Sequence, residues 1–308
     1  MRINNNISAI NTHRQYGINA GNLGRTVERL SSGFRVNRAA DDAAGLAISE
    51  KMRAQIRGLN QASRNSQDGV SLVQTAEGGL QTIQNILQRI RELAIQAGAD
   101  TNTPWDRSAL QLEVNQLLDE IDQIVDTTEF NTMRLLSGSF SANAGIGPNN
   151  TPVAAGDGQP LRIQVGANQN QVMQVTIGSM SRWALFAADT GTYTVDGDTR
   201  TVNFQLGQVS IGGNGSAARA GIQRIQNALD SVSMLRAHLG SYQNRLEFKI
   251  HNLDNQAENL AAAESRIRDA DMAQLMTHFT RNNILFQAST AMLAQANALP
   301  QSVLQLLG

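Results

Sequence analysis

The sequence predicts a mainly α-helical chain: an elongated antiparallel helical bundle or coiled coil built from both termini, with a small β-rich insert in the middle. Three observations predict this fold class. Apolar residues recur at alternating steps of three and four in three long stretches, a spacing typical of coiled-coil seams. Residues 141–211 instead contain short runs in which apolar and polar residues alternate, as in strands. Aromatic residues make up only 4% of the 308 residues, which is lean for an enzyme core and common in helical rods.

The first 24 residues predict a helix that is weak on its own. They carry only two formal charges, and Ile3, Ile7 and Ile10 form an apolar stripe at steps of four and three. Three glycines in the same stretch destabilise a helix by about 2–3 kcal/mol relative to alanine. We therefore expect this helix to form only when it packs against other helices.

Three seams follow along the chain. The first consists of Val73, Ala76, Leu80, Ile83, Leu87, Ile90 and Ala94. The second consists of Leu110, Val114, Leu117, Ile121 and Ile124. The third consists of Ile225, Leu229, Val232, Leu239, Leu246, Ile250, Leu253, Ala257 and Leu260, with Arg236 and Gln243 at two further seam positions. Matching seams in both halves of the sequence indicate an antiparallel bundle.

A helix start is predicted between the first two seams. Gly98 ends the first helix, and Thr103 is placed to be the N-cap of the next. Pro104 suits the first helical turn, and Asp106 is the acid of a capping box. Further on, we expect a β-hairpin near residues 128–140.

The insert at 141–211 predicts short strands with loose turns. Its alternating runs are Leu161/Ile163/Val165, Met173/Val175/Ile177 and Val202/Phe204/Leu206. Because the insert lies between the two helical halves, we expect it to project from the end of the bundle that is remote from the termini.

The chain from Asn282 to Gly308 contains no charged residue. Its polar stripe includes Gln287, Thr290 and Asn297, and Pro300 interrupts the run, so it does not have the roughly 20 mostly apolar residues of a membrane span. The opposite, apolar stripe consists of Leu285, Ala288, Met292, Ala296 and Leu299. Either this helix packs on its own domain, or both of its faces are covered in an assembly. We expect the two nearly uncharged ends to pair and to be stabilised by neighbouring subunits.

Two charged stretches adjoin these ends. One contains Arg35, Arg38, Asp41 and Asp42, and the other contains Arg266, Arg268, Asp269 and Asp271. Their spacings of three and four allow intrahelical ion pairs, each contributing about 0.2–0.5 kcal/mol. They are either solvated helix faces or charges that set the register between subunits.

Nothing in the sequence predicts catalysis, a metal or a cofactor. The four histidines are scattered, and no HExxH, P-loop, GxGxxG or GxSxG motif occurs. The chain has no cysteine, which excludes disulfides and thiolate metal sites. A net charge of −1 gives no general attraction to nucleic acid or anionic membrane. The N-terminus shows no secretory signal peptide, so we expect any export to use another route.

The two ends of the chain resemble bacterial flagellin. Residues 30–80, LSSGFRVNRAADDAAGLAISEKMRAQIRGLNQASRNSQDGVSLVQTAEGGL, resemble the family's N-terminal signature. Residues 239–274, LGSYQNRLEFKIHNLDNQAENLAAAESRIRDADMAQ, resemble its C-terminal signature, and MLAQANALPQSVLQLLG resembles its closing segment. The likeness covers about three quarters of the chain, in order, and omits 141–211.

The resemblance implies a structural subunit that polymerises into the helical flagellar filament for swimming motility. It implies that 1–40 plus 268–308 form an inner tube of paired terminal helices around a channel. Residues 41–140 plus 212–267 would then form a helical rod domain, and 141–211 would be a variable outer insert. We expect Gln287, Thr290 and Asn297 to face the channel, where a neutral lining lets unfolded chains slide past.

The resemblance also implies the partners. These are further copies of the chain, a flagellin export chaperone, the flagellar type III export apparatus, the filament cap and the hook–filament junction proteins. The expected location is extracellular, in the flagellar filament, after secretion without a cleaved signal peptide. A hook–filament junction protein is the alternative function, and a secreted enzyme or adhesin with a binding insert is a further one.

A surface patch near the first seam completes the expectations. Gln88, Arg89 and Glu92 point off the seam, and Glu113 on the next helix is expected nearby. These are ordinary solvated charges unless the resemblance extends to them. In similar flagellins the matching positions contribute to subunit packing and to innate immune recognition by the vertebrate Toll-like flagellin receptor. The matching residues are Leu87, Gln88, Arg89, Glu92, Leu93, Glu113 and Gln116.

Overall fold

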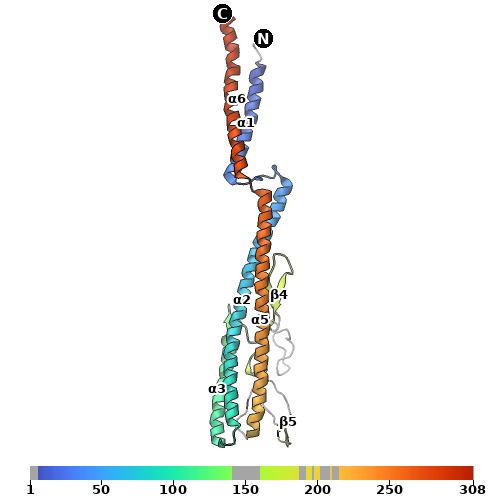
Figure 1. Cartoon of the computed structure of the whole chain (residues 1–308), viewed down its shortest axis with the longest axis vertical. Helices are drawn as coiled ribbons and strands as arrows, with labels where there is room; N and C mark the ends of the chain where they lie inside the picture. Colours follow the sequence, from blue (N-terminus) through green and yellow to red (C-terminus); the bar gives the residue numbers. More distant parts are fainter. Residues whose placement is uncertain are drawn as a thin grey trace. The chain divides into compact units, whose positions relative to one another are not determined.

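The chain folds mainly into long helices, which confirms the predicted fold class (Figure 1). The computed structural model describes residues 6–140, 160–186, 192–195, 198–201, 209 and 215–307. The helices are α1 (Ile7–Ser32), α2 (Ala43–Ala97), α3 (Pro104–Thr127), α4 (Arg182–Leu185), α5 (Gly215–Arg268) and α6 (Met272–Leu307). The strands are β1 (Glu129–Phe130), β2 (Met133–Arg134), β3 (Leu161–Gln164), β4 (Val172–Val175), β5 (Thr192–Val195) and β6 (Asp198–Thr201).

The chain divides into two compact units. One contains both ends, Met1–Arg57 and Gln256–Gly308, and the other contains Gly58–Asn255. The boundaries fall inside α2 and α5, so both helices contribute to both units. The predicted division of the chain into an inner part, a rod and an insert stays a prediction.

The central unit, Gly58–Asn255, holds the apolar core between α2, α3 and α5. All seven residues of the first predicted seam are buried with no exposed surface. The second seam is partly shifted, because Leu118 and Val125 are buried where Leu117 and Ile124 are only half-buried. In the third seam Ile250 and Leu260 are also only half-buried. A straight helix has 3.6 residues per turn, so a strict repeat of 3.5 drifts around it.

The start of α3 is fixed by its cap, as predicted. The Thr103 hydroxyl accepts a hydrogen bond from the Asp106 amide at 3.3 Å, and the Asp106 carboxylate accepts one from the Thr103 amide at 3.0 Å. The Thr103 hydroxyl also donates to that carboxylate at 2.7 Å. These bonds, the hydroxyl contact first, lower the pKa of Asp106. Pro104 occupies the first turn, where no amide hydrogen is needed.

Two antiparallel hairpins complete the well-packed part of this unit. Strands β1 and β2 are joined by Asn131 and Thr132, whose φ angles of 49° and 65° are those of a type I′ turn. Strands β3 and β4 pair over four residues each, from Leu161 opposite Val175 to Gln164 opposite Val172. Strands β5 and β6 form a third hairpin. The predicted run at 202–206 lies outside the described residues.

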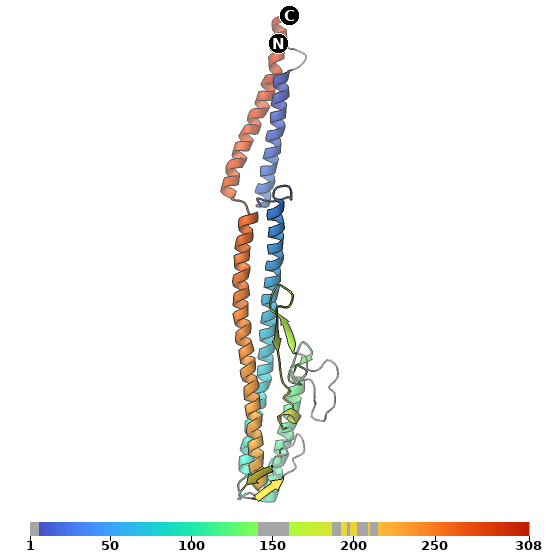
Figure 2. The same ribbon diagram turned by 90° about the vertical axis from the view of Figure 1, so that its right-hand side faces the viewer.

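The prediction that the insert projects beyond the helices is wrong for residues 160–186. The β3–β4 hairpin lies along α2 and α5 (Figure 2), and five of its apolar side chains join the helical core: Ile163, Val165, Met173, Val175 and Ile177. The hairpin approaches α2 closely, since a Cβ on Gly58 would lie 2.9 Å from Ala167 Cβ. Burial of one apolar face of the hairpin explains why it folds back.

Candidate assembly surface

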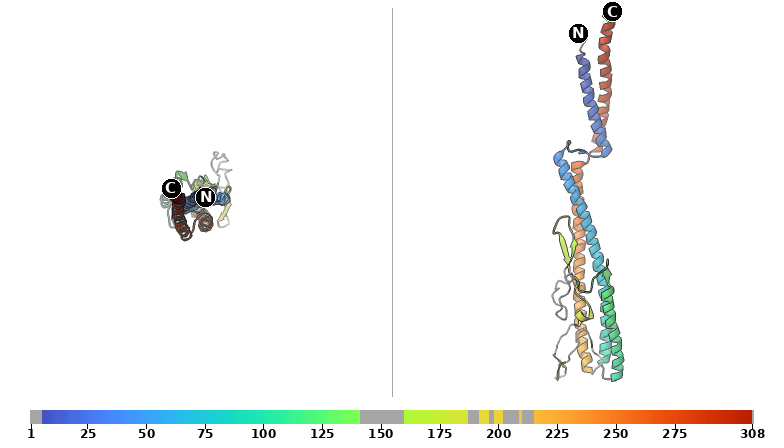
Figure 3. Two further views of the ribbon diagram at one scale, coloured as in Figure 1. Left: turned by 90° about the horizontal axis from the view of Figure 1, so that it is seen from above. Right: turned by 180° about the vertical axis from the view of Figure 1, so that it is seen from behind.

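The two terminal helices lie side by side and antiparallel (Figures 1 and 3). Their inward-facing positions recur at alternating steps of three and four, as in a coiled coil. On α1 these positions are Ala9, Thr12, Tyr16, Asn19, Leu23, Thr26 and Leu30. On α6 they are Leu275, Phe279, Asn282, Phe286, Ser289, Leu293 and Ala296.

The seam between these helices is polar at alternate positions. Asn19 Nδ2 donates to Ser289 Oγ at 2.5 Å, and both side chains are buried. Asn282 Nδ2 donates to Thr26 Oγ1 at 2.9 Å. The rings of Tyr16 and Phe286 also meet across the seam, with centroids 5.2 Å apart. The seam therefore combines hydrogen-bonded layers with apolar ones.

The start of α1 is tied to α6 by its own cap residue. The Asn6 side-chain oxygen accepts a hydrogen bond from the Ala9 amide at 3.1 Å and so caps α1. The same side chain donates through Nδ2 to the Ala296 carbonyl at 2.7 Å. One residue thus begins α1 and anchors it to its partner helix.

Many large apolar side chains are exposed on the outward-facing surfaces of this pair. The exposed large apolar residues are Ile7, Ile10, Ile18, Val27, Met272, Met276, Ile284, Leu285 and Met292. Ile10 keeps 63% of its surface exposed and Met292 keeps 59%. Exposed apolar surface on this scale is unusual for a folded monomer and indicates a surface that another molecule covers.

The predicted apolar stripes are not the surfaces that join α1 to α6. Ile7, Ile10, Leu285, Ala288 and Met292 are exposed, and only Ala296 lies in the seam. The side chains of Ile3 and Leu299 lie outside the described part of the chain. Five of the fourteen seam positions are Asn, Ser or Thr, so the contact between the two helices does not follow the most apolar stripe of either one. The predicted polar residues Gln287, Thr290 and Asn297 are exposed.

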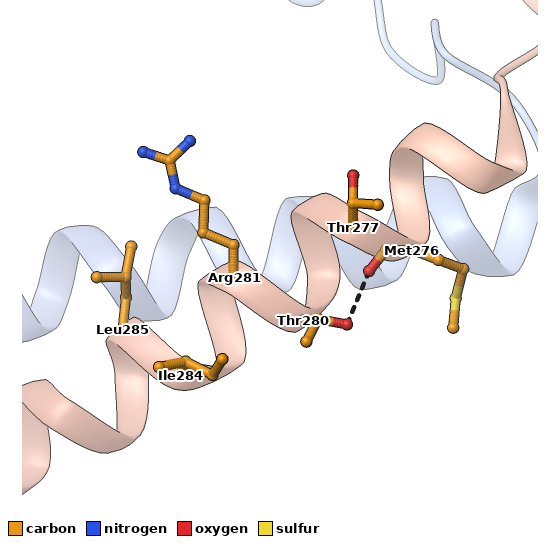
Figure 4. Close-up of a pocket in the computed structure, with 6 residues that line it drawn as sticks. All are labelled: Met276, Thr277, Thr280, Arg281, Ile284 and Leu285. Carbon is orange, nitrogen blue, oxygen red and sulfur yellow. Dashed lines mark hydrogen bonds between the residues drawn. The ribbon is translucent and has the colours of Figure 1, made fainter.

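A shallow hollow lies on the first turns of α6, on its exposed side (Figure 4). Its lining is mostly apolar, although the side chains include two threonines and one arginine: Met276, Thr277, Thr280, Arg281, Ile284 and Leu285. The Thr280 hydroxyl donates to the Met276 carbonyl at 3.0 Å, so its polar atom is already used within the helix. The hollow presents methyl and methylene groups to its surroundings, with Arg281 as the last charge before the uncharged tail.

The two segments that connect the terminal helices to α2 and α5 form a clasp. Phe34 and Asp269 pair as an isolated antiparallel bridge. The Arg35 amide donates to the Arg268 carbonyl at 2.7 Å, and the Ala270 amide donates to the Gly33 carbonyl at 3.0 Å. Gly33 has a φ of 75°, the left-handed conformation that ends α1 at little cost for glycine.

Side chains reinforce the clasp. The Arg268 guanidinium lies over the Phe34 ring, 4.7 Å from its centroid, and contacts a Glu50 carboxylate oxygen at 2.6 Å. The Arg35 guanidinium donates to the Ile267 carbonyl at 2.6 Å. The hydrogen bond from Arg268 is the main reason that the pKa of Glu50 is lowered.

The expected intrahelical ion pairs are wrong, because the Arg35–Asp42 stretch lies outside the helices. Arg38 pairs with Glu28 at 2.8 Å and Asp41 pairs with Arg29 at 3.0 Å, so both reach back to α1. Asp41 also accepts hydrogen bonds from the amides of Arg38 and Asn37 at 3.2 and 3.3 Å, and the bond from Arg38 is the largest cause of its lowered pKa. Asp42 caps the first turn of α2 through the Gly45 amide at 2.8 Å, and Arg266 is exposed.

The clasp predicts acid sensitivity. Glu50 has a lower pKa in the folded chain than its ordinary value of 4.5, so its contribution to stability is complete above that value. The contribution disappears as the pH falls through the lowered pKa, when Glu50 takes up a proton. Thermal unfolding followed from pH 7 to pH 3 should therefore show the native chain and Glu50→Gln converging as the pH falls. A constant gap between the two would contradict the role of the Glu50 charge.

The surface patch predicted near the first seam, called the Arg89 patch from here on, is only partly exposed. Arg89 contacts Glu113 at 3.0 Å and Glu92 at 3.2 Å, and the bond to Glu113 is the main cause of its raised pKa. Gln88 and Gln116 are exposed as well. Leu87 and Leu93, by contrast, are buried in the core, with 0% and 1% exposure. Because both side chains are buried in the helical core, neither can belong to a contact surface of this chain.

Within the described ranges, no group of three histidines or acidic residues is arranged to hold a metal ion. Among the helices described, none has a stretch long and apolar enough to cross a membrane.

The polar seam of the terminal helices was missed at the level of sequence. A signal for it exists, since Thr12, Asn19 and Thr26 recur every seven residues, as do Asn282 and Ser289. Hydrophobic periodicity does not detect such a repeat, because it scores only apolar positions.

Comparison with known proteins identifies the nature of these ends. A family model of the bacterial flagellin N-terminal helical region matches residues 3–141, and one of the bacterial flagellin C-terminal helical region matches 222–307. The chain is 49% identical to a flagellin of Halalkalibacterium halodurans and 48% identical to one of Bacillus subtilis, with 100% of each chain covered. Among solved structures it is similar to Bacillus cereus flagellin, with 31% identity and a TM-score of 0.45, over 65% of this chain and 94% of that one.

Proposed function

Because the chain belongs to the bacterial flagellin family and is a structural subunit of the flagellar filament, we propose that the outer stripes of α1 and α6 hold the subunits together. The outer stripes are defined as Ile7, Ile10 and Ile18 on α1 and Ile284, Leu285 and Met292 on α6. The single observation that carries this proposal is their exposure. The pairing of α1 with α6 covers the seam residues and leaves these apolar side chains exposed.

Burial energetics support the outer stripes as the adhesive surface. Full burial of one Leu, Ile or Met side chain contributes about 1.5–3 kcal/mol. The neighbouring side chains of the tail carry no charge that would have to be desolvated when the copies meet. The same side chains in an unassembled chain promote aggregation, so an export chaperone that covers α6 suits them.

The polar stripe of α6 has a different role in this proposal. Gln287, Thr290 and Asn297 are exposed and uncharged, and they line the channel of the filament. A neutral lining neither attracts nor repels the charges of an unfolded chain in transit. The chain then leaves through the flagellar type III export apparatus without signal cleavage, is folded at the filament cap, and resides outside the cell.

Seeded polymerisation of purified chain tests the outer stripes. We expect Ile284→Glu to remain in the supernatant after sedimentation, because the interface would bury an unpaired carboxylate. Gln287→Glu is the matched control, since it introduces the same charge three residues further along the same helix. The purified Gln287→Glu chain should polymerise in vitro, whereas in cells its export and its filament length should be reduced. Normal sedimentation of Ile284→Glu would disprove the stripe proposal, and normal cellular filament length of Gln287→Glu would disprove the channel proposal.

The exposed members of the Arg89 patch support a second role. Gln88, Arg89, Glu92, Glu113 and Gln116 form a rigid polar surface on two packed helices. Such a surface suits contact with a neighbouring subunit in the filament, and with the vertebrate Toll-like flagellin receptor when the chain is free. Leu87 and Leu93 take part only by holding the two helices in place.

A further inference from the structure

The buried groups between α1 and α6 follow a strict spacing. Thr26 faces Asn282, and seven residues further along each helix Asn19 faces Ser289. One more heptad brings Thr12 level with Ala296. Polar layers of one helix thus meet polar or small layers of the other, at intervals of one heptad.

The hydrogen bonds within each polar layer are directional. Thr26 Oγ1 donates to the Asn22 carbonyl at 2.8 Å, and Ser289 Oγ donates to the Leu285 carbonyl at 2.6 Å. Each hydroxyl has then used its only hydrogen within its own helix, and its lone pairs remain to accept. The amide of an asparagine on the opposite helix supplies the donor in both layers. The asparagine lies on α1 in one layer and on α6 in the other.

A shift of α6 along α1 breaks these pairs. A slip of one heptad in one direction places Asn19 opposite Ala296, which has no side-chain acceptor. A slip in the other direction places Thr26 opposite Leu275. Either slip leaves a buried polar group without its partner, which is costly, whereas the apolar layers tolerate exchange among Tyr, Phe and Leu.

We propose that the Asn19–Ser289 and Thr26–Asn282 hydrogen bonds set the register of α1 on α6. A single buried asparagine is known to fix register in coiled coils. Here the two bonds select one of several registers that the apolar residues alone would allow. They thereby fix which outer-stripe residues of α1 and α6 lie level with each other.

The distance between two spin labels tests this register directly. The chain has no cysteine, so nitroxides attach only where cysteines are introduced. Ser8→Cys and His278→Cys place the labels on exposed positions near opposite ends of the seam. A slip of one heptad changes their separation along the helix axis by about 10 Å. Dilution of labelled chain in unlabelled chain restricts the measurement in filaments to distances within one chain.

We expect one distance for the native seam. Replacement of both buried pairs, Asn19→Leu with Ser289→Leu and Thr26→Val with Asn282→Leu, removes both hydrogen bonds and should add a second population displaced by about 10 Å. Replacement of two exposed glutamines, Gln15→Leu with Gln295→Leu, is the matched control and should keep the single distance. The exchange Asn19→Ser with Ser289→Asn, made with Thr26→Val and Asn282→Leu in place, restores one amide–hydroxyl pair and should restore the single distance.

A single, unshifted distance in the leucine variant would overturn the proposal. If the leucine variant does not enter filaments while the glutamine control does, the distance measured in the variant with the exchanged pair is decisive. One distance then supports the proposal, and two distances overturn it. The outer stripes are tested by sedimentation and the register by a distance within the chain, so the two proposals fail independently.

Discussion

A chain that ends at Arg281 is expected to remain in the supernatant under conditions in which the full-length chain forms sedimenting filaments. The truncation removes the polar layers and the aromatic partner that α6 offers to α1, from Asn282 to Ala296. It also removes Leu285 and Met292 of the outer stripes. The remaining α1 contains Gly17, Gly21 and Gly24, each costing a helix about 1 kcal/mol relative to alanine, so we expect it to unfold.

The central unit provides the internal control for this truncation. Its core between α2, α3 and α5 lies within Gly58–Asn255 and does not include the tail. Its thermal transition should therefore persist in the truncated chain, while helicity by circular dichroism falls. If that transition is also lost, the failure to polymerise would report misfolding instead of a missing interface.

The other outcomes of the truncation experiment distinguish between interpretations of the uncharged tail. If both chains form filaments by electron microscopy, the tail is not needed for polymerisation, and its lack of charge must serve export or chaperone binding. If neither chain forms filaments from native seeds, the purified subunit does not assemble under these conditions, and the tail is not the cause. Only assembly of the full-length chain alone agrees with the outer stripes.

The two units differ in how far their sequence predicts them, and the reason is the composition of their seams. The seam from Val73 to Ala94 is apolar at every position, so its period alone shows which face is buried. The terminal seam holds Asn19, Thr26 and Ser289, while Ile10 and Met292 face outward. Hydrophobic periodicity then points to the surface proposed to join different copies. The pairing of the two ends was predicted, but the residues that make the contact were not.

The hairpin and the clasp could not be predicted for a different reason. Alternation correctly placed strands at Leu161 and Val175, but a strand pattern does not show which surface covers its apolar face. The pairs between Arg38 and Glu28 and between Arg268 and Glu50 join residues 10 and 218 positions apart. Helical spacing rules consider neighbours only three or four residues apart, and the linker that brings these charges together is not helical.

Leu87→Ala is expected to lower the free energy of unfolding of the central unit by about 2–5 kcal/mol. Leu87 is completely buried in the α2 seam, so the shortened side chain leaves a cavity among tightly packed neighbours. Gln88→Ala, at the adjacent exposed position, should change the same free energy by less than about 0.5 kcal/mol. Denaturant titration of both variants, followed by circular dichroism, measures the difference.

The same pair of variants decides how the Arg89 patch can be studied. If Leu87→Ala weakens receptor binding or subunit packing, the loss reflects a loosened α2–α3 scaffold, because the side chain itself does not reach the surface. Arg89→Ala removes the contacts to Glu92 and Glu113 but leaves the core intact. It should therefore weaken receptor binding or subunit packing with little change in the free energy of unfolding. A Leu87→Ala chain as stable as the native one would show that the seam repacks, and would contradict its assignment as part of the scaffold beneath the patch.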